Sequence, residues 1–187
     1  VTANKVTISH DTSGVTAGTY GSQTQIPSLT IDADGDNDAN VTVVGTNDIT
    51  VDTSIEAGTG SVTVSGKALS LGAVSGNGGI DIDSSNDVTL TSATSTGAID
   101  ITATANIVSS TDINAGTGAG NDVSLAASTL TMNDAGTAND ISGDDITINM
   151  SNDTAASVIG GELVANNDVT ISGGNIDVIK NGVAAKG

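Results

Sequence analysis

Short apolar triplets recur along this chain at a nearly fixed interval, and this repetition constrains the fold more than any other feature. Each triplet places two aliphatic residues around a Thr, Ser or Asp, and successive triplets begin 21, 18, 19, 24, 23 and 23 residues apart. The first series begins at Val41, Val62, Ile80, Ile99, Val123, Ile146 and Val169. A second series lags by seven or eight residues and begins at Ile49, Leu69, Val88, Ile107, Leu130 and Ile176. Repetition at this spacing is typical of a solenoid, whose repeats bury their apolar faces against one another.

We therefore predict an all-β fold, a right-handed parallel β-helix (β-solenoid) of about seven coils between Val41 and Val178. Side chains alternate between the two faces of a strand, so the outer residues of each triplet point inward and the middle one faces solvent. The crossover rule for parallel strands gives the right hand. The third side of each coil carries one apolar or small inward residue: Ile55, Val74, Ala93, Ile113 and Ala135. A β-sandwich is the alternative, since it also contains short strands separated by turns.

The composition suits a narrow core with many corners. There is no Phe or Trp, and Tyr20 is the only aromatic residue, so the core must consist of Val, Ile, Leu and Ala. Asn-Asp pairs precede apolar strand starts at 47–48, 86–87, 121–122, 139–140 and 167–168. Both residue types accept left-handed backbone geometry and bond to nearby amides, which favours corners. Stacked corners of this kind predict polar ladders along the solenoid.

Two regions depart from the repeat. Residues 1–40 contain the single proline, Pro27, and the single histidine, His10, and we interpret them as an atypical N-terminal end unit or cap. Residues 41–187 form the β-solenoid repeats, with a loop insertion near 150–164 that includes residues 157–161. The chain begins with Val1 rather than Met and shows no signal-like segment, which suggests a processed mature protein or a piece of a longer one.

The charge of the chain narrows the classes of partner. Its formal net charge is −18, from 22 acidic residues against four lysines, with no arginine. Such a surface repels nucleic acid and anionic membranes, and it attracts divalent cations. No apolar stretch approaches the roughly 18 residues of a membrane-spanning helix. The absence of cysteine excludes disulfides and thiolate metal sites and is compatible with an exposed extracellular location in a prokaryote.

The sharpest local motif is an acidic loop, in which Asp32, Asp34, Asp36 and Asp38 alternate with other residues around Gly35. Alternate carboxylates in an extended loop bring several hard oxygen donors around one cation, as calcium requires. The order is similar to that of calcium-binding aspartate loops in extracellular repeat proteins, although the downstream Glu of an EF-hand is missing. We predict a calcium site here, with a solvated acidic turn as the alternative.

Outward aspartates on the predicted strands raise the question of catalysis. Asp81, Asp83 and Asp100 resemble the paired carboxylates of polysaccharide-cleaving β-helices. Those enzymes also need cations or aromatic platforms to hold the sugar, and this chain has no arginine and one aromatic residue. We therefore predict that the protein is not an enzyme and that these charges keep a strand face soluble.

Some phrases of the repeat resemble those of a known class of proteins. They are Asn-Asp-Val-Thr-Leu at 86–90, Asn-Asp-Val-Ser-Leu at 121–125, Gly-Ala-Ile-Asp-Ile at 97–101 and Gly-Asn-Ile-Asp-Val at 174–178. In this respect residues 41–180 resemble the repeat regions of filamentous-haemagglutinin-like and other large repetitive secreted bacterial surface proteins. The resemblance implies an extracellular right-handed β-helix that serves as a stalk, fibre or adhesive surface.

Two functions follow as predictions. The first is a structural extracellular protein, a β-solenoid subunit or segment that self-associates end to end into a surface filament. Exposed coil ends carry unpaired backbone groups, and another copy satisfies them. The alternative is an adhesin module that binds glycans or proteins on host or other surfaces, with calcium as a possible cofactor.

Overall fold

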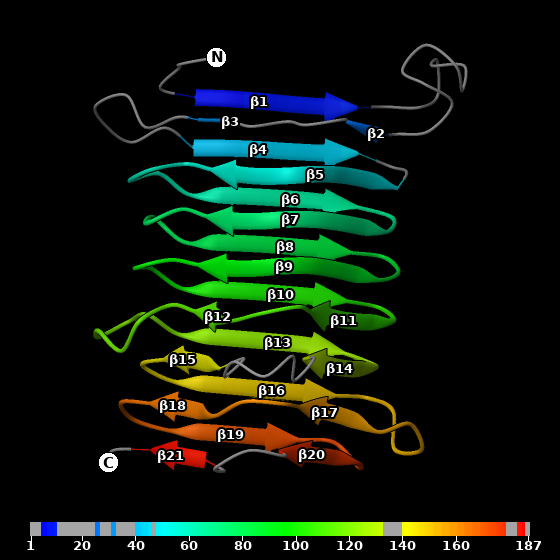
Figure 1. Ribbon diagram of the computed structural model, residues 1–187, viewed down its shortest axis with the longest axis vertical. Helices are drawn as coiled ribbons and strands as arrows, with labels where there is room; N and C mark the ends of the chain where they lie inside the picture. Colours follow the sequence, from blue (N-terminus) through cyan, green and yellow to red (C-terminus); the bar gives the residue numbers. More distant parts are fainter. Residues whose placement is uncertain are drawn as a thin grey trace.

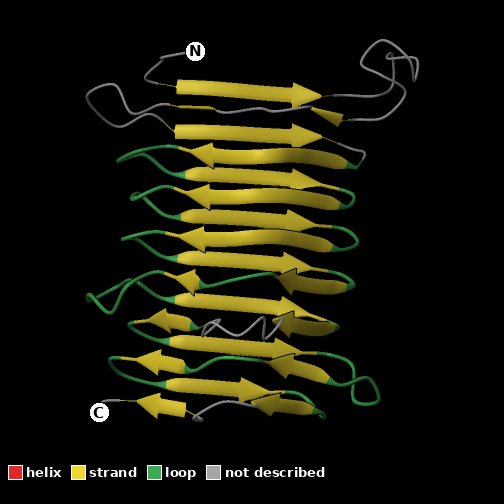
Figure 2. Ribbon diagram, in the orientation of Figure 1, coloured by secondary structure: helices red, strands yellow, loops and turns green. Residues whose placement is uncertain are grey.

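The computed structural model describes residues 5–10, 25–26, 31–32, 40–45, 48–132, 140–178 and 183–185. Among these residues there are strands, turns and loops but no helix (Figure 2). The strands stack along one long axis, with β1 at one end and β19, β20 and β21 at the other (Figure 1).

One side of the stack is an eight-stranded parallel sheet, here called sheet A. In spatial order its strands are β1 (Lys5–His10), β4 (Asn40–Gly45), β6 (Val62–Gly66), β8 (Ile80–Ser84), β10 (Ile99–Ala103), β13 (Val123–Ala127), β16 (Ile146–Met150) and β19 (Val169–Ser172). From β6 to β19 the apolar first residue of each strand faces that of its neighbours, as Ile80 faces Val62 and Ile99. Sheet A therefore consists of the first triplet series, with β1 added at its edge.

The rest of each coil belongs to a second parallel sheet, here called sheet B. Its early coils contribute long strands, which are β5 (Ile49–Glu56), β7 (Leu69–Ser75) and β9 (Val88–Thr94). Its later coils contribute two short strands each, which are β11 (Asn106–Ser109) and β12 (Ile113–Asn114), β14 (Thr129–Met132) and β15 (Ile141–Gly143), β17 (Ser157–Ile159) and β18 (Leu163–Ala165), and β20 (Ile176–Val178) and β21 (Val183–Ala185). The strands β2 (Gln25–Ile26) and β3 (Ile31–Asp32) pair with β5 at the opposite end.

The predicted right-handed β-solenoid is confirmed, with about six turns. The seven predicted triplets of the first series are the seven strands from β4 to β19, and six turns separate the first from the last. Neighbouring strands run parallel and come from successive coils, as with β13 and β16. The β-sandwich alternative is wrong, because sandwiches are built from antiparallel strands.

The core is a set of aliphatic columns between the two sheets. One column in sheet A runs through Val43, Val64, Ile82, Ile101, Leu125, Ile148 and Ile171. From Val43 to Ile148 these side chains are at most 2% exposed. This column consists of Val, Ile and Leu alone, so it needs no aromatic ring to fill it.

The third side of the coil follows the prediction over four coils and departs from it in the fifth. Ile55, Val74, Ala93 and Ile113 are buried and aligned in register. The next member is Ile141 rather than Ala135, which lies outside the described residues. Ile141 follows its partner Ile113 by 28 residues, so the inward position lies further along the chain than regular spacing predicts.

The predicted loop near 150–164 is only partly a loop. Residues 151–156 contain no strand, but Ser157–Ile159 form β17, which pairs with β14 and β20. Assigning residues 157–161 to an inserted loop was therefore wrong for the first three of them. The reason is Ser157, which is 1% exposed and occupies an inward position between Leu130 and Ile176. Its Oγ accepts a hydrogen bond from the Leu130 N–H at 3.0 Å, which satisfies a polar atom in the core.

The described parts of residues 1–40 continue both sheets. β1 pairs in register with β4, and β2 and β3 pair with β5. Their backbones therefore follow the path of a coil. That these residues cap the solenoid stays a prediction.

Candidate functional site

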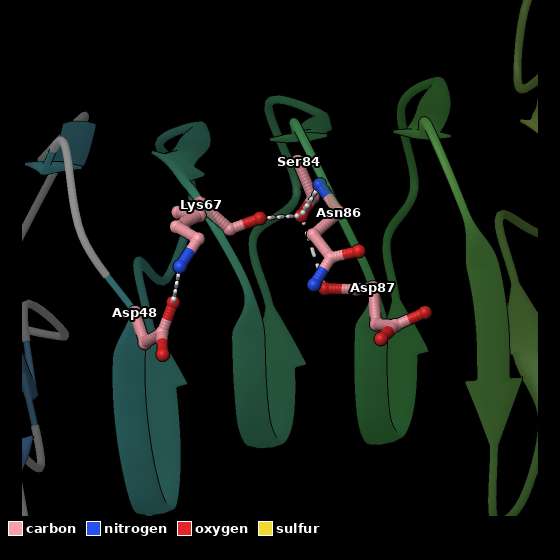
Figure 3. Close-up of polar contacts among 5 residues, drawn as sticks. All are labelled: Asp48, Lys67, Ser84, Asn86 and Asp87. Atoms are coloured by element: carbon pink, nitrogen blue, oxygen red, sulfur yellow. Dashed lines mark hydrogen bonds and ion pairs between the residues drawn. The ribbon is translucent and has the colours of Figure 1, made fainter.

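The corners between sheets A and B are held by short polar side chains that bond across coils (Figure 3). The Ser84 hydroxyl donates to the Lys67 carbonyl of the preceding coil at 2.7 Å and accepts from the Asn86 N–H at 3.1 Å. Nearby, Lys67 Nζ lies 3.9 Å from Asp48 Oδ1, but both side chains are 60% exposed, so this ion pair adds little stability. The corner is thus shaped by hydrogen bonds to the backbone rather than by charge pairs.

The predicted polar ladders exist, but they also use aspartates outside the Asn-Asp pairs, such as Asp112 and Asp145. At the corner before sheet A, the carboxylate of Asp122 accepts from the Asp145 N–H at 3.2 Å, and that of Asp145 accepts from the Asp168 N–H at 3.0 Å. On the far side of the coil, Asp140 donates its N–H to Asp112 at 3.0 Å. In each case a carboxylate accepts the backbone N–H of the next coil toward the C-terminus. The ladders therefore have a direction along the solenoid.

Asp144 is an acid that the sequence analysis did not single out. It is 6% exposed, and its Oδ2 accepts from the Gly120 N–H at 2.8 Å. Its Oδ1 accepts from the side-chain amides of Asn166 at 3.0 Å and Asn167 at 2.9 Å. The Asn166 amide and the Gly120 N–H lower the pKa of Asp144 below its ordinary value of 3.8, against the opposing effect of burial. One carboxylate thus joins three successive coils.

Asp144→Asn is expected to lower the melting temperature at pH 7. Because the folded-state pKa of Asp144 is depressed, its contribution is present above pH 3.8 and is lost as pH falls through the folded pKa. The difference in melting temperature between the wild type and the variant should therefore shrink as pH falls below 3.8. Thermal melts of both proteins at a series of pH values measure it. A difference equally large at pH 7 and at strongly acid pH would contradict this role.

The outer face of sheet A carries an acidic patch, defined here as Asp81, Asp83 and Asp100. All three are exposed, and Asp81 faces Asp100 across the β8–β10 pair. Burial, Asp83 and Asp100 together raise the pKa of Asp81. Asp81 and Asp100 line a shallow depression together with Ser61, Thr63 and Ala98. The arrangement brings like charges together, with no cationic partner among the described residues.

Asp81→Asn is expected to stabilise the protein at pH 7. The folded-state pKa of Asp81 is raised, so its contribution is favourable below pH 3.8 and is lost as pH rises through the folded pKa. We expect a gain on the order of a few tenths of a kcal/mol, as for removal of facing like charges, and a smaller gain in high salt. Urea titrations at pH 7 and pH 3 measure it. The control is Asp153→Asn, which removes the same charge in the exposed loop after β16 and should leave stability unchanged. If this control gained as much stability as Asp81→Asn, the cause would be the lower net charge and not the contact between Asp81 and Asp100.

The predicted calcium loop falls almost wholly outside the described residues. Only Asp32 lies within them, in β3, where it pairs with Glu56. Asp34, Asp36 and Asp38 are not described, so calcium at this loop stays a prediction. Over the parts of the chain with a described structure, no group of three or more His, Asp or Glu side chains is arranged to hold a metal ion.

The C-terminal end of the stack differs from its interior. Ile171 is 37% exposed, whereas Ile148, one coil earlier in the same column, is 0% exposed. Val169, Ile176 and Val178 are likewise only partly buried. Ile171 and Val44 are the only large apolar side chains that are well exposed among the described residues. Among the described residues, β19, β20 and β21 each pair with a neighbour on one side only, and we call this end the open C-terminal end.

The chain matches no protein-family model, no curated protein and no solved structure. The resemblance to filamentous-haemagglutinin-like proteins accordingly stays a prediction. Within the described part of the chain, no helix has the length and apolar character needed to cross a bilayer.

Proposed function

We propose that the protein is a structural subunit of an extracellular filament, in which solenoids associate end to end. The fold agrees with a structural or adhesin-like repeat protein. The open C-terminal end favours the filament subunit over the adhesin. There, the column that buries Ile148 leaves Ile171 37% exposed. Stacking another coil buries this surface and pairs the free strand edge without any new chemistry.

The charge distribution supports association through the ends rather than the sides. The net charge is −18, and the outward positions of sheet A carry Thr, Ser, Asn and Asp, apart from Val44 and Ala126. Two solenoids side by side would bring like charges together, which costs free energy. A contact between different ends of identical units does not close, so it gives a fibre rather than a dimer.

A charged residue at the open end tests this function. Ile171→Glu is expected to abolish assembly, because the joint would bury an unpaired carboxylate. The fold should survive, since Ile171 is already 37% exposed in the single chain. Sedimentation velocity over a range of concentrations measures the assembly, and circular dichroism checks the fold.

The matched control is Thr170→Glu, which adds the same charge at an exposed position one residue away. This variant should assemble like the wild type. Wild-type protein that stays monomeric at every concentration would overturn the proposed function, and monodisperse rods that bind glycans or proteins would favour the adhesin alternative.

A further inference from the structure

The two outer strands of sheet A carry the same four residues. β1 contains Val-Thr-Ile-Ser at 6–9, and β19 contains Val-Thr-Ile-Ser at 169–172. These strands lie at opposite ends of the stack (Figure 1). Their register is also the same, because Val6 and Ile8 pair with Val41 and Val43, while Val169 and Ile171 pair with Ile146 and Ile148. Both tetrapeptides thus occupy the same place in a coil.

We propose that the joint between copies is head-to-tail and in register, with β19 of one copy pairing in parallel with β1 of the next. This inference rests on the proposed function and specifies its interface. Val169 then faces Val6, and Ile171 faces Ile8, so both apolar columns of sheet A continue through the joint. Stacked aliphatic residues of equal size are what the interior of the solenoid already uses, as in the pairing of Ile82 with Ile101.

Sheet B gives the same register independently. At one end, Ile26 pairs with Val51 and Ile31 pairs with Ile55. Following these two columns through the coils leads to Val178 and Val183 at the other end. The register that aligns Val169 with Val6 therefore also sets Val178 opposite Ile26 and Val183 opposite Ile31. Apolar residues meet in each of these columns.

The corner ladder before sheet A adds a directional polar contact. It passes from Asp122 to Asp145 to Asp168, each carboxylate accepting the N–H of the following coil. Among the residues that the structure describes, the Asp168 carboxylate accepts no hydrogen bond. In the joint, the residue that follows Asp168 in this ladder is Lys5, which directly precedes Val6. The joint therefore supplies the missing N–H and sets one of the four lysines against an aspartate.

A joint between two C-terminal ends lacks these features. A two-fold contact would pair β19 with itself in antiparallel orientation and would stop at a dimer. It would also bring two copies of the acidic Asp168 corner to one interface, where like charges repel. Charge and strand direction both favour the head-to-tail joint.

Cysteine cross-linking tests the joint directly, because the chain contains no cysteine. Thr7→Cys and Thr170→Cys are prepared as single variants, mixed at a concentration at which the wild type assembles, and oxidised with copper phenanthroline. Residues in register on parallel neighbours lie about 4.8 Å apart, which is within the range of a disulfide. We expect a disulfide-linked pair in the mixture and none in either variant alone.

Two controls calibrate this experiment. Thr147→Cys with Thr170→Cys in one chain is an internal pair in register, and it should form its disulfide readily. Thr7→Cys mixed with Ser172→Cys is two residues out of register and should react at least about tenfold more slowly, because the separation exceeds disulfide reach. Equal rates for Thr170→Cys and Ser172→Cys would overturn the proposed register.

The outcomes separate this inference from the proposed function. Assembly without a Thr7–Thr170 cross-link, or a cross-link in Thr170→Cys alone, overturns the head-to-tail joint while end-to-end assembly stands. No assembly of the wild type overturns both. As a second readout, Asp168→Lys should weaken assembly about tenfold, and Lys5→Asp in the same chain should restore it. Failure of the double variant to recover would contradict the Lys5–Asp168 contact.

Discussion

Ile148→Asp is expected to destabilise the protein by on the order of 4–5 kcal/mol, or to prevent cooperative folding altogether. Ile148 is 0% exposed and stacks between Leu125 and Ile171 in the inward column of sheet A. An aspartate at this position buries a carboxylate that has no hydrogen-bond donor, and it removes the aliphatic contact with two coils at once. Urea unfolding followed by circular dichroism, at one fixed protein concentration, measures the loss.

The neighbouring Thr147→Asp is the matched control for this prediction. Thr147 is exposed on the outer face of the same strand, and it faces Ser124 and Thr170 rather than another acid. A carboxylate introduced at residue 147 should therefore change the free energy of unfolding by no more than about 0.5 kcal/mol. If both variants lost stability equally, the inward and outward assignment of this strand would be wrong.

The second large effect is expected at a corner where backbones touch. Gly78 donates its N–H to the Gly60 carbonyl of the preceding coil at 2.9 Å. A Cβ at residue 78 would lie 2.9 Å from the Gly60 carbonyl carbon and 3.0 Å from the Ser61 nitrogen. Neither of these backbone atoms can move without displacing a coil. Gly78→Ala should therefore cost about 1–3 kcal/mol, the range for overpacking, as a lower urea midpoint measures.

Gly118→Ala serves as the control for this corner. A Cβ at residue 118 has as its nearest neighbour the side-chain amide of Asn121 at 3.1 Å, and this flexible group is free to rotate away. Stability should therefore change little. A loss at Gly118→Ala as large as at Gly78→Ala would mean that the close approach of successive backbones is not what requires glycine at residue 78.

The sequence predicted the columns wherever two aliphatic residues enclose a polar one. Ile80 and Ile82 are two residues apart, as side chains on one face of a strand are, so this spacing identifies the side chains that face inward. The same signal fails where an inward position is polar. Ser157 interrupts the alternation, and only the hydrogen bond from the Leu130 N–H, made across coils, makes a serine acceptable there. Local pattern carries no information on such a distant partner.

Neither the length of the coil that contains Ile141 nor the burial of Asp144 could be predicted from the sequence, and the reasons are related. Ala135 stands near the expected spacing, but the coil lengthens and Ile141 takes the inward position. From the sequence, Asp144 would be expected in an exposed turn. Its burial depends on hydrogen bonds from Gly120, Asn166 and Asn167, which lie more than 20 residues away in the chain. The tetrapeptide shared by β1 and β19 can be seen in the sequence, but only the strand order shows that its two copies lie at the two edges of sheet A.

Cryo-electron microscopy of the assembled wild-type protein tests end-to-end stacking most directly. If solenoids stack in register, the filament is one solenoid wide, and its strands repeat about every 4.8 Å along the axis without a break at the joints. Separate rods at high concentration, or filaments in which solenoids lie side by side with their ends exposed, would contradict the account.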